Sequence, residues 1–347
     1  MTEADEPTQL ASGEAAAEGP AVTTPAVRTR RGRSVPELTA LVAFFVVEVV
    51  FFSLKSPYFW HPLSTNGWDN WLNILTAVAV AGIIAAPATL LLVAGQFDLS
   101  VGSGTAFTGV MLAYMVAGHG LSIWVGVLLV LAVGLGIGLI NGFFVTVVGV
   151  NALITTLGML AVLRGLGKVV SGGQTLILDN FGSLGTSRPF WNIPTPVLIL
   201  LGIFVVFWFI MRYTVFGRSM YAIGANPVAA RLTGIRSKRL IFVGFLLSGL
   251  CTALGGLILT SQLGAASPVA SLGLELSVVT AVILGGASLA GGRGTILGTI
   301  LGLLIIGVLN NGLILLNIDP FYQEVAQGTL LIAAVSLDQL RIRLTSG

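Results

Sequence analysis

Three carboxylates, Glu48, Asp98 and Glu275, lie within or beside long apolar runs of the sequence. A carboxylate inside a membrane span is a candidate for proton or ion coupling, because its charge is costly to bury in lipid. Asp98 and Glu275 lie where apolar runs begin, however, and a carboxylate there also caps a helix. Glu48 lies well inside its run, where it either couples ions or hydrogen-bonds a neighbouring helix.

Groups for covalent or metal chemistry are scarce. The chain has two histidines, His61 and His119, and one cysteine, Cys251, which excludes a disulfide framework, a zinc cluster and an iron–sulfur site. It has no Gly-x-x-x-x-Gly-Lys-Ser/Thr segment, so it cannot hold ATP phosphates in the P-loop manner. We therefore expect no catalytic residue, no metal and no cofactor, and a chain that is not an enzyme.

The composition identifies a membrane protein. Of 347 residues, 55% are hydrophobic and 9% are charged, whereas an average soluble domain carries about 25% charged residues. This excludes a soluble globular enzyme and a nucleic-acid-binding chain. The predicted fold class is an all-α polytopic membrane protein.

Ten runs are candidate spans, since a helix needs about 20 mainly apolar residues to cross a bilayer. They lie at 36–54, 72–94, 101–117, 121–141, 152–170, 194–211, 240–262, 275–290, 295–316 and 324–337. The third, fifth, eighth and tenth runs are short or interrupted by Gly and polar residues, which indicates short or broken helices.

The Lys and Arg residues predict the orientation. With ten spans and the basic N-terminal tail inside, 13 of the 17 lie in the cytoplasm, so both termini are expected there. Arg164 and Lys168, near the outer end of the fifth span, are interpreted as reaching the outer headgroups. The predicted domains are a disordered cytoplasmic tail at 1–34, a transmembrane domain at 35–340 with a cytoplasmic loop at 212–239, and a cytoplasmic tail at 341–347.

The two halves of the chain show a weak internal repeat. Residues 98–101 (DLSV) recur as 275–278 (ELSV), and the spacing of Asn141-Gly142 to Gly158 recurs in Asn311-Gly312 to Gly328. The matches shift by five spans, an odd number, so the two halves would have opposite orientations. Inverted repeats are typical of transporters, with the path at the repeat interface.

Polar side chains at span ends and breaks are candidates to line such a path. The alternative is that they cap helices or hydrogen-bond between helices. The candidates are Asp98, Ser100, Asn151, Thr155, Glu275 and Asn311. Because Glu48 is the one mid-span candidate for an ion relay, we expect another subunit to supply the energy for uphill transport.

The basic loop at 212–239 contains a candidate docking element. After Asn226-Pro227, residues 228–232 can form a short helix, with Pro in its first turn and Gly234 as its terminator. Such a helix either lies on anionic headgroups or enters a groove of a partner protein. Its apolar face is small, and Asn226-Pro227 and Gly234-Ile235 flank it closely, which favours the groove of a partner protein.

The same loop resembles a known family. Residues 222–235 (AIGANPVAARLTGI) resemble the coupling loop of ABC importer permeases of the ribose/xylose/arabinose type, and Ala229-Ala230-x-x-x-Gly234 matches the core of the importer motif. Val228 stands where that motif has Glu, and its later Ile-x-Leu-Pro part is missing. Residues 95–102, 151–158 and 285–295 resemble further segments of this family, in the family's order.

The resemblance implies a fold of the vitamin B12-importer type, with spans two to five and seven to ten related by a pseudo-twofold axis in the membrane plane. It also implies a place in a bacterial cytoplasmic (inner) membrane. The implied partners are a second permease subunit in a homodimer, a cytoplasmic ATPase, an extracytoplasmic solute-binding protein and membrane lipid, but no nucleic acid. The residues expected to contact the ATPase are Gly224, Asn226, Pro227, Ala229, Ala230, Arg231, Gly234 and Ile235.

We therefore expect the transmembrane permease subunit of an ABC importer that translocates a monosaccharide, a pentose or related sugar, with a separate ATPase as its motor. One alternative is an ABC permease for branched-chain amino acids or nucleosides. Others are a self-contained ion-coupled secondary transporter and a channel-like membrane protein. A bulky residue at Gly234 should uncouple an ABC permease and barely affect a transporter that has no ATPase.

Overall fold

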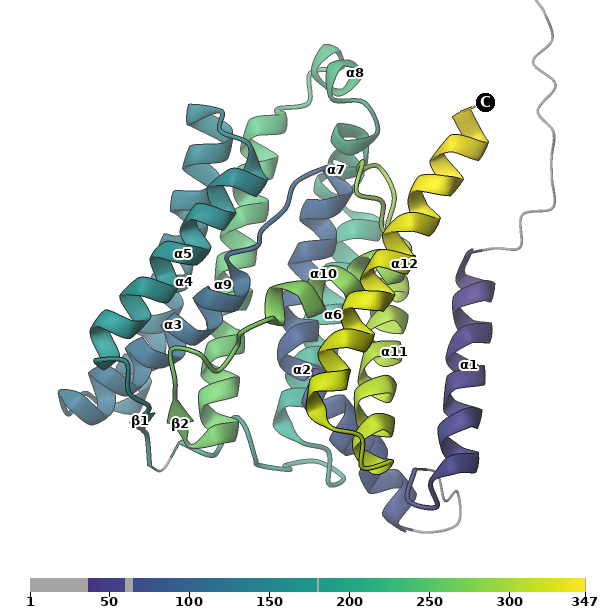
Figure 1. The fold of residues 1–347 in the computed structure, drawn as a ribbon. Helices are drawn as coiled ribbons and strands as arrows, with labels where there is room; N and C mark the ends of the chain where they lie inside the picture. Colours follow the sequence, from purple (N-terminus) through teal and green to yellow (C-terminus); the bar gives the residue numbers. More distant parts are fainter. Residues whose placement is uncertain (1–36, 60–64, 180, 347) are drawn as a thin grey trace, which may run out of the picture. The chain divides into compact units, whose positions relative to one another are not determined.

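The computed structural model describes residues 37–59, 65–179 and 181–346, and the tail predicted at 1–34 lies outside them. The described chain is a bundle of apolar helices (Figure 1), which confirms the all-α polytopic membrane class. The helices are α1 (Glu37–Lys55), α2 (Thr65–Val93), α3 (Val101–Ala113), α4 (Ile123–Phe143), α5 (Ala152–Ser171), α6 (Thr195–Tyr213), α7 (Val215–Ala225), α8 (Pro227–Leu232), α9 (Ser237–Leu263), α10 (Leu274–Leu284), α11 (Ile296–Leu315) and α12 (Pro320–Ser346). Single π-helical turns extend α3 over Tyr114–Gly118 and α4 over Phe144–Val148.

Eight helices of the described chain are long and apolar enough to cross a membrane: α1 to α6, α9 and α11. The eighth predicted span is the 11-residue helix α10, which at about 1.5 Å per residue is too short to cross alone. The tenth lies in α12, which is not among these eight helices; its Gln327 accepts a hydrogen bond from Ser277 of α10 and donates one to Asn310 of α11. The fifth is not broken, since α5 runs without interruption from Ala152 to Ser171.

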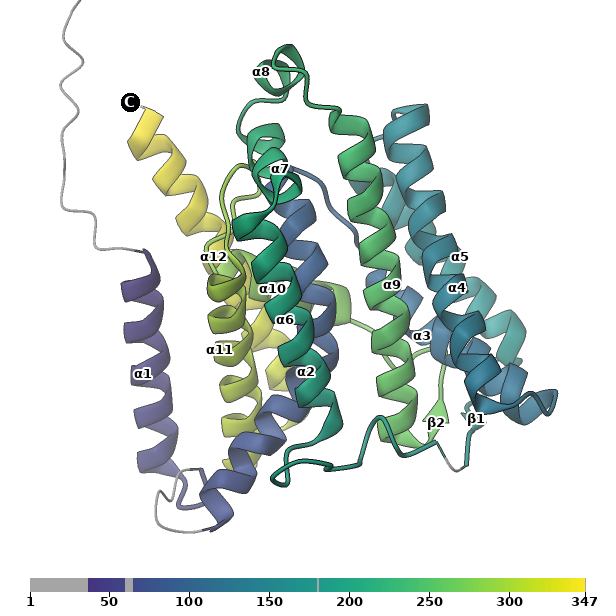
Figure 2. The same cartoon turned by 180° about the vertical axis from the view of Figure 1, so that it is seen from behind.

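The helix α2 is the centre of the packing, in contact with α6, α9, α10 and α11, whereas α1 lies at the periphery against α11 (Figures 1 and 2). Close contacts between α10 and α11 depend on glycine. A Cβ at Gly302 would lie 2.1 Å from the carbonyl oxygen of Ala281, and one at Gly298 would lie 2.0 Å from that of Gly285. These glycines therefore serve helix packing within the subunit.

Packing partners recur between the two halves. The helix α4 packs on α9 as α11 packs on α2, and α3 packs on α9 as α10 packs on α2. Likewise, α3 contacts α5 as α10 contacts α12. Exchange of α2 to α5 with α9 to α12 would convert each pairing into the other. The pairings support the inverted repeat, which stays a prediction.

The two ends of the bundle differ. One end, here called the α8 end, holds α7 and α8, the start of α9 and the end of α6 (Figure 1). The other, the β end, holds the antiparallel strands β1 (Leu176–Ile177) and β2 (Ala265–Ala266). There the long loop before α6 is fastened to α9, because the Ser261 hydroxyl accepts from the Gly185 N–H (2.8 Å) and donates to the Phe181 carbonyl.

Candidate functional site

The short helix α8 is closed at its start by a side-chain cap. The Asn226 side chain accepts hydrogen bonds from the N–H groups of Val228 (3.1 Å) and Ala229 (3.0 Å), and Pro227 occupies the first turn. An N–H in the first turn has no partner within the helix, so the cap satisfies donors that would otherwise need water. The helix predicted at 228–232 is confirmed and begins one residue earlier.

The end of α8 is closed by the backbone alone. The N–H of Ile235 donates to the carbonyl of Ala230 (3.0 Å), and the N–H of Gly234 donates to the carbonyl of Arg231 (3.1 Å). This is a Schellman motif, which requires a left-handed residue after the helix, and Gly234 has φ of +81°. Six residues thus form a rigid helix, although an isolated helix of this length would be unstable in water.

The surface of α8 is apolar where it faces outward. Val228 and Leu232 are 68% and 84% exposed, whereas Ala230 is buried. Residues four apart lie on the same side of a helix, so Val228 and Leu232 form one exposed apolar patch at the tip of the α8 end. Ala229 and Arg231 are exposed beside it. A small apolar patch with a basic neighbour on a rigid helix is suited to a protein groove.

The base of α8 is set by close backbone contact. Gly224, in the last turn of α7, lies so near α2 that a Cβ there would be 1.9 Å from the Val93 carbonyl oxygen and 2.5 Å from the Gly292 nitrogen. The Gly292 N–H itself donates to that carbonyl at 2.8 Å. Gly224 is therefore the position at which α7, the end of α2 and the turn at 285–295 meet. The helix α7 was not predicted, because the basic loop gave no apolar run there.

The glycine-rich turn at 285–295 is shaped to fit this junction. Gly291 and Gly292 have φ of +85° and +76°, which L-residues with a side chain rarely adopt. The Tyr221 hydroxyl of α7 donates to the Gly294 carbonyl at 2.6 Å. Burial raises the pKa of Tyr221 above its usual value, so the hydroxyl keeps its proton and stays a donor.

Among the path candidates, Asp98 and Ser100 lie together in a buried network. Asp98 accepts from the Ser100 hydroxyl (2.6 Å) and N–H (3.1 Å) through Oδ1, and from the Ser248 hydroxyl (2.7 Å) through Oδ2. Asn141 donates to the Ser100 hydroxyl at 2.9 Å. The network ties the break between α2 and α3 to α4 and α9, so it fixes the geometry of the break.

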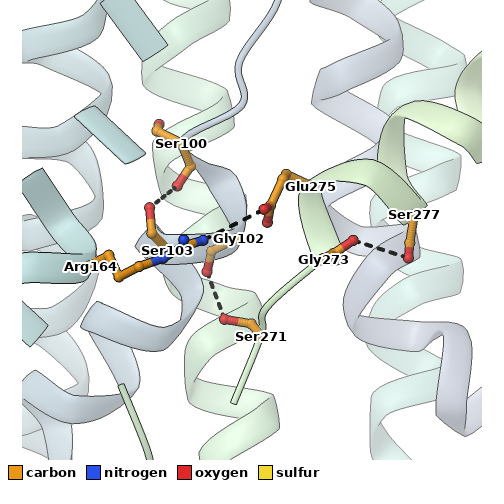
Figure 3. Close-up of polar contacts among 8 residues, drawn as sticks. All are labelled: Ser100, Gly102, Ser103, Arg164, Ser271, Gly273, Glu275 and Ser277. Carbon is orange, nitrogen blue, oxygen red and sulfur yellow. Dashed lines mark hydrogen bonds and ion pairs between the residues drawn. The ribbon is translucent and has the colours of Figure 1, made fainter. Parts of the chain in front are cut away.

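Glu275 lies in the first turn of α10 and faces Arg164 of α5 (Figure 3). Arg164 Nη2 is 3.8 Å from Glu275 Oε1, and this is the ion pair found within the described chain. Glu275 Oε2 is buried beside Gly102, with no hydrogen-bond partner there. The Ser271 hydroxyl donates to the Gly102 carbonyl at 2.7 Å (Figure 3). Arg164 therefore pairs across the bundle, and its assignment to the outer headgroups was wrong.

The other three path candidates belong neither to the Asp98 network nor to the pair that Glu275 forms with Arg164. Asn311 exchanges hydrogen bonds with Asn70 of α2 (2.9 and 3.0 Å). Asn151 caps α5 through the Leu153 N–H (2.8 Å) and lines a cavity of about 710 Å³ at the α8 end, which Arg231 also lines. Thr155 is half-buried on the next turn of α5. The six candidates are thus spread along the bundle rather than gathered in one pocket.

Two contributors escaped the sequence reasoning. Ser248 lies in a run of Leu, Ser and Gly without local distinction, and its role comes from contact with Asp98. Asn70 lies before an expected span and matters because it meets Asn311. Each pairing joins residues far apart in the chain, so no local spacing could reveal it.

The comparisons with known proteins agree on one kind of protein. The family described as "Branched-chain amino acid transport system / permease component" matches residues 70–335. The ribose import permease protein RbsC of Escherichia coli strain K12 is 38% identical over 308 residues, which cover 87% of this chain and 93% of that protein.

Two further relatives extend the comparison. RbsC of Bacillus subtilis strain 168 is 39% identical over 87% of this chain and 92% of its own length. The L-arabinose transport system permease protein AraH of Escherichia coli K12 is 39% identical over 78% of this chain and 83% of its own length. No solved structure matches the chain.

Proposed function

Because the chain belongs to the permease family of branched-chain amino acid transport systems, we propose that it is the membrane subunit of an ABC importer for a monosaccharide. The family description names amino acids, but the similar relatives include ribose and arabinose permeases. Pentoses are therefore the preferred substrate class over branched-chain amino acids and nucleosides. The observation that carries the proposal is α8, a capped helix with an exposed apolar patch at the position of the family's coupling loop.

The α8 end faces the cytoplasm in this proposal. Arg212, Arg218 and the basic residues from Arg231 to Arg239 lie there, which accords with the usual excess of Lys and Arg on the cytoplasmic side. A separate cytoplasmic ATPase binds α8 through Val228 and Leu232. An extracytoplasmic solute-binding protein docks at the β end, and a second copy of the chain completes the path.

In this proposal, a movement of α8 is transmitted to the transmembrane helices through closely packed contacts. When the ATPase pair closes on ATP, it displaces α8 together with α7, because caps at both ends prevent α8 from fraying. The displacement reaches α2 and the turn at 285–295 through the contact of Gly224 with Val93 and Gly292. Packed elements of this kind shift as units between discrete arrangements. The path then opens alternately to each side.

The test is uptake by proteoliposomes that contain the permease, its co-purified ATPase and a binding protein. The proposal predicts ATP-dependent accumulation of ribose or arabinose, no accumulation of leucine, and loss of uptake in Val228→Asp. Ile177→Asp, at the β end and 67% exposed, is the matched control for ATPase binding: it should keep the co-purified ATPase, which Val228→Asp should lose. Accumulation driven by an ion gradient without ATP, and lost in Glu48→Gln, would support the secondary-transporter alternative.

A further inference from the structure

A second cavity opens at the α8 end, between the end of α6, the helix α7 and the start of α11. It has a volume of about 610 Å³, and its charged lining consists of Arg212 and Arg218. No acidic residue lines it. In the sequence, Glu275 is the one Asp or Glu between residues 180 and 318, and in the described structure it pairs with Arg164. Among the residues that the structure describes, the two positive charges of this cavity thus have no acidic partner.

The two guanidinium groups keep most of their donors free for a ligand. Arg218 Nη1 donates one hydrogen bond, to the Tyr213 carbonyl at 3.3 Å. A guanidinium carries five N–H donors in a planar fork that fits phosphate oxygens. Both side chains are exposed. Two forks beside one cavity therefore form a surface suited to an anion that has several oxygens.

Apart from Thr295, the rest of the cavity lining is apolar or aromatic. Trp208, Met211 and Leu297 line it together with the arginines, and Leu297 is 56% exposed. The outer face of α6 continues this surface with exposed Val205 and Phe209. Trp and Tyr beside Arg at the end of an apolar helix are typical of the membrane interface, and basic pockets between helices at that depth hold anionic lipid headgroups.

We propose that this cavity binds an anionic phospholipid. Arg212 and Arg218 hold its phosphate, and Trp208, Met211 and Leu297 contact its glycerol and the first methylenes of its acyl chains. An acidic surface of the ATPase is the less favoured occupant, because the lining includes apolar residues of α6 and does not include the exposed patch of α8. The inference needs only that the chain spans a membrane, so it does not depend on which solute the chain transports.

The experiment is native mass spectrometry of the full-length permease released from nanodiscs that contain equal phosphatidylglycerol and phosphatidylcholine. Wild type should retain phosphatidylglycerol. Arg212→Gln and Arg218→Gln should each reduce the retained fraction about five-fold, the effect expected for one basic residue at an anionic surface. Arg188→Gln, which removes an exposed arginine on the loop before α6, should retain it fully. Leu297→Glu should lose the phosphatidylglycerol although Arg212 and Arg218 are both still present.

Several results would overturn the proposal. Unchanged retention in both glutamine variants would do so, and so would an equal loss in Arg188→Gln. Displacement of phosphatidylglycerol by excess inorganic phosphate would assign the cavity to a free anion. Loss of co-purified ATPase with retention of the lipid would assign the arginines to the ATPase. If a glutamine variant fails to fold, two other variants still decide. The double variant Arg212→Lys with Arg218→Lys should keep the lipid, and Leu297→Glu should lose it.

Discussion

The N–H of Gly292 donates to the carbonyl oxygen of Val93 at 2.8 Å, and it thereby joins the glycine-rich turn before α11 to the last residue of α2. Gly224 of α7 packs against the same two residues. Three segments from distant parts of the chain therefore meet through backbone atoms, at the base of α8. Contacts between backbones leave little room to deform, so a push on α8 is transmitted rather than absorbed.

The first prediction concerns this junction. Gly224→Ala would place a Cβ 1.9 Å from the Val93 oxygen, so α7 must shift. We expect a loss of about 1–3 kcal/mol in the free energy of unfolding, as for other overpacked sites, and a marked loss of ATP-driven uptake. Thermal melting and vesicle uptake measure the two effects. Gly202→Ala in α6 is the control, because its Cβ would meet no atom within 4 Å. Normal uptake in Gly224→Ala would contradict the account.

The second prediction concerns the end of α8. Gly234→Ala forces a side chain into the left-handed region, at a cost of about 1–2 kcal/mol, and no atom within 4 Å adds a clash. We expect α8 to fray and the ATPase to be lost on co-purification, while membrane insertion stays normal. Gly120→Ala is matched, since Gly120 has φ of +66° and equally open space. Equal ATPase recovery from the two variants would show that the closed end of α8 is irrelevant.

The third prediction concerns the break between α2 and α3. Ser248→Ala removes the donor to Asp98 Oδ2, and a buried acceptor left without its donor costs about 1–3 kcal/mol. We expect a lower melting temperature and slower uptake with normal ATPase binding. The losses of Ser248→Ala and Asp98→Asn should be less than additive in a double-mutant cycle. Ser53→Ala is the control, because that hydroxyl donates to Val49 of its own helix.

The fourth prediction concerns Arg164 and Glu275. The Arg164 side chain is 33% exposed, so solvent screens the pair and we expect a coupling free energy of at most about 1 kcal/mol. A double-mutant cycle with Arg164→Gln and Glu275→Gln, followed by thermal melting, measures it. Lys168→Gln removes an exposed charge from the same helix and should show no coupling to Glu275. Strictly additive losses from Arg164→Gln and Glu275→Gln would show that the contact contributes nothing.

Sequence reasoning succeeded where structure is local. Asn226-Pro227 and Gly234 mark the start and end of α8, and the apolar runs mark the spans, because capping and hydrophobicity are properties of neighbouring residues. It also placed the run at 275–290 among the short or broken helices, and α10 does end at Leu284; what it could not give is the reason. There Gly285 approaches the backbone of α11 and the chain turns back. The partner of Arg164 was missed because the contact depends on how α5 and α10 each pack against α3.

The most direct test of the central claim, that α8 binds a separate ATPase, is cross-linking from Leu232→Cys. Leu232 is 84% exposed, and Cys251, the one cysteine of the chain, is buried, so a thiol reagent acts on the introduced residue. In native membranes, a short thiol cross-linker should join Leu232→Cys to a chain with Walker motifs, whereas Ile177→Cys at the β end should not react with it. The account would be contradicted if Leu232→Cys formed no such product while the permease remained active, or if both positions formed it equally.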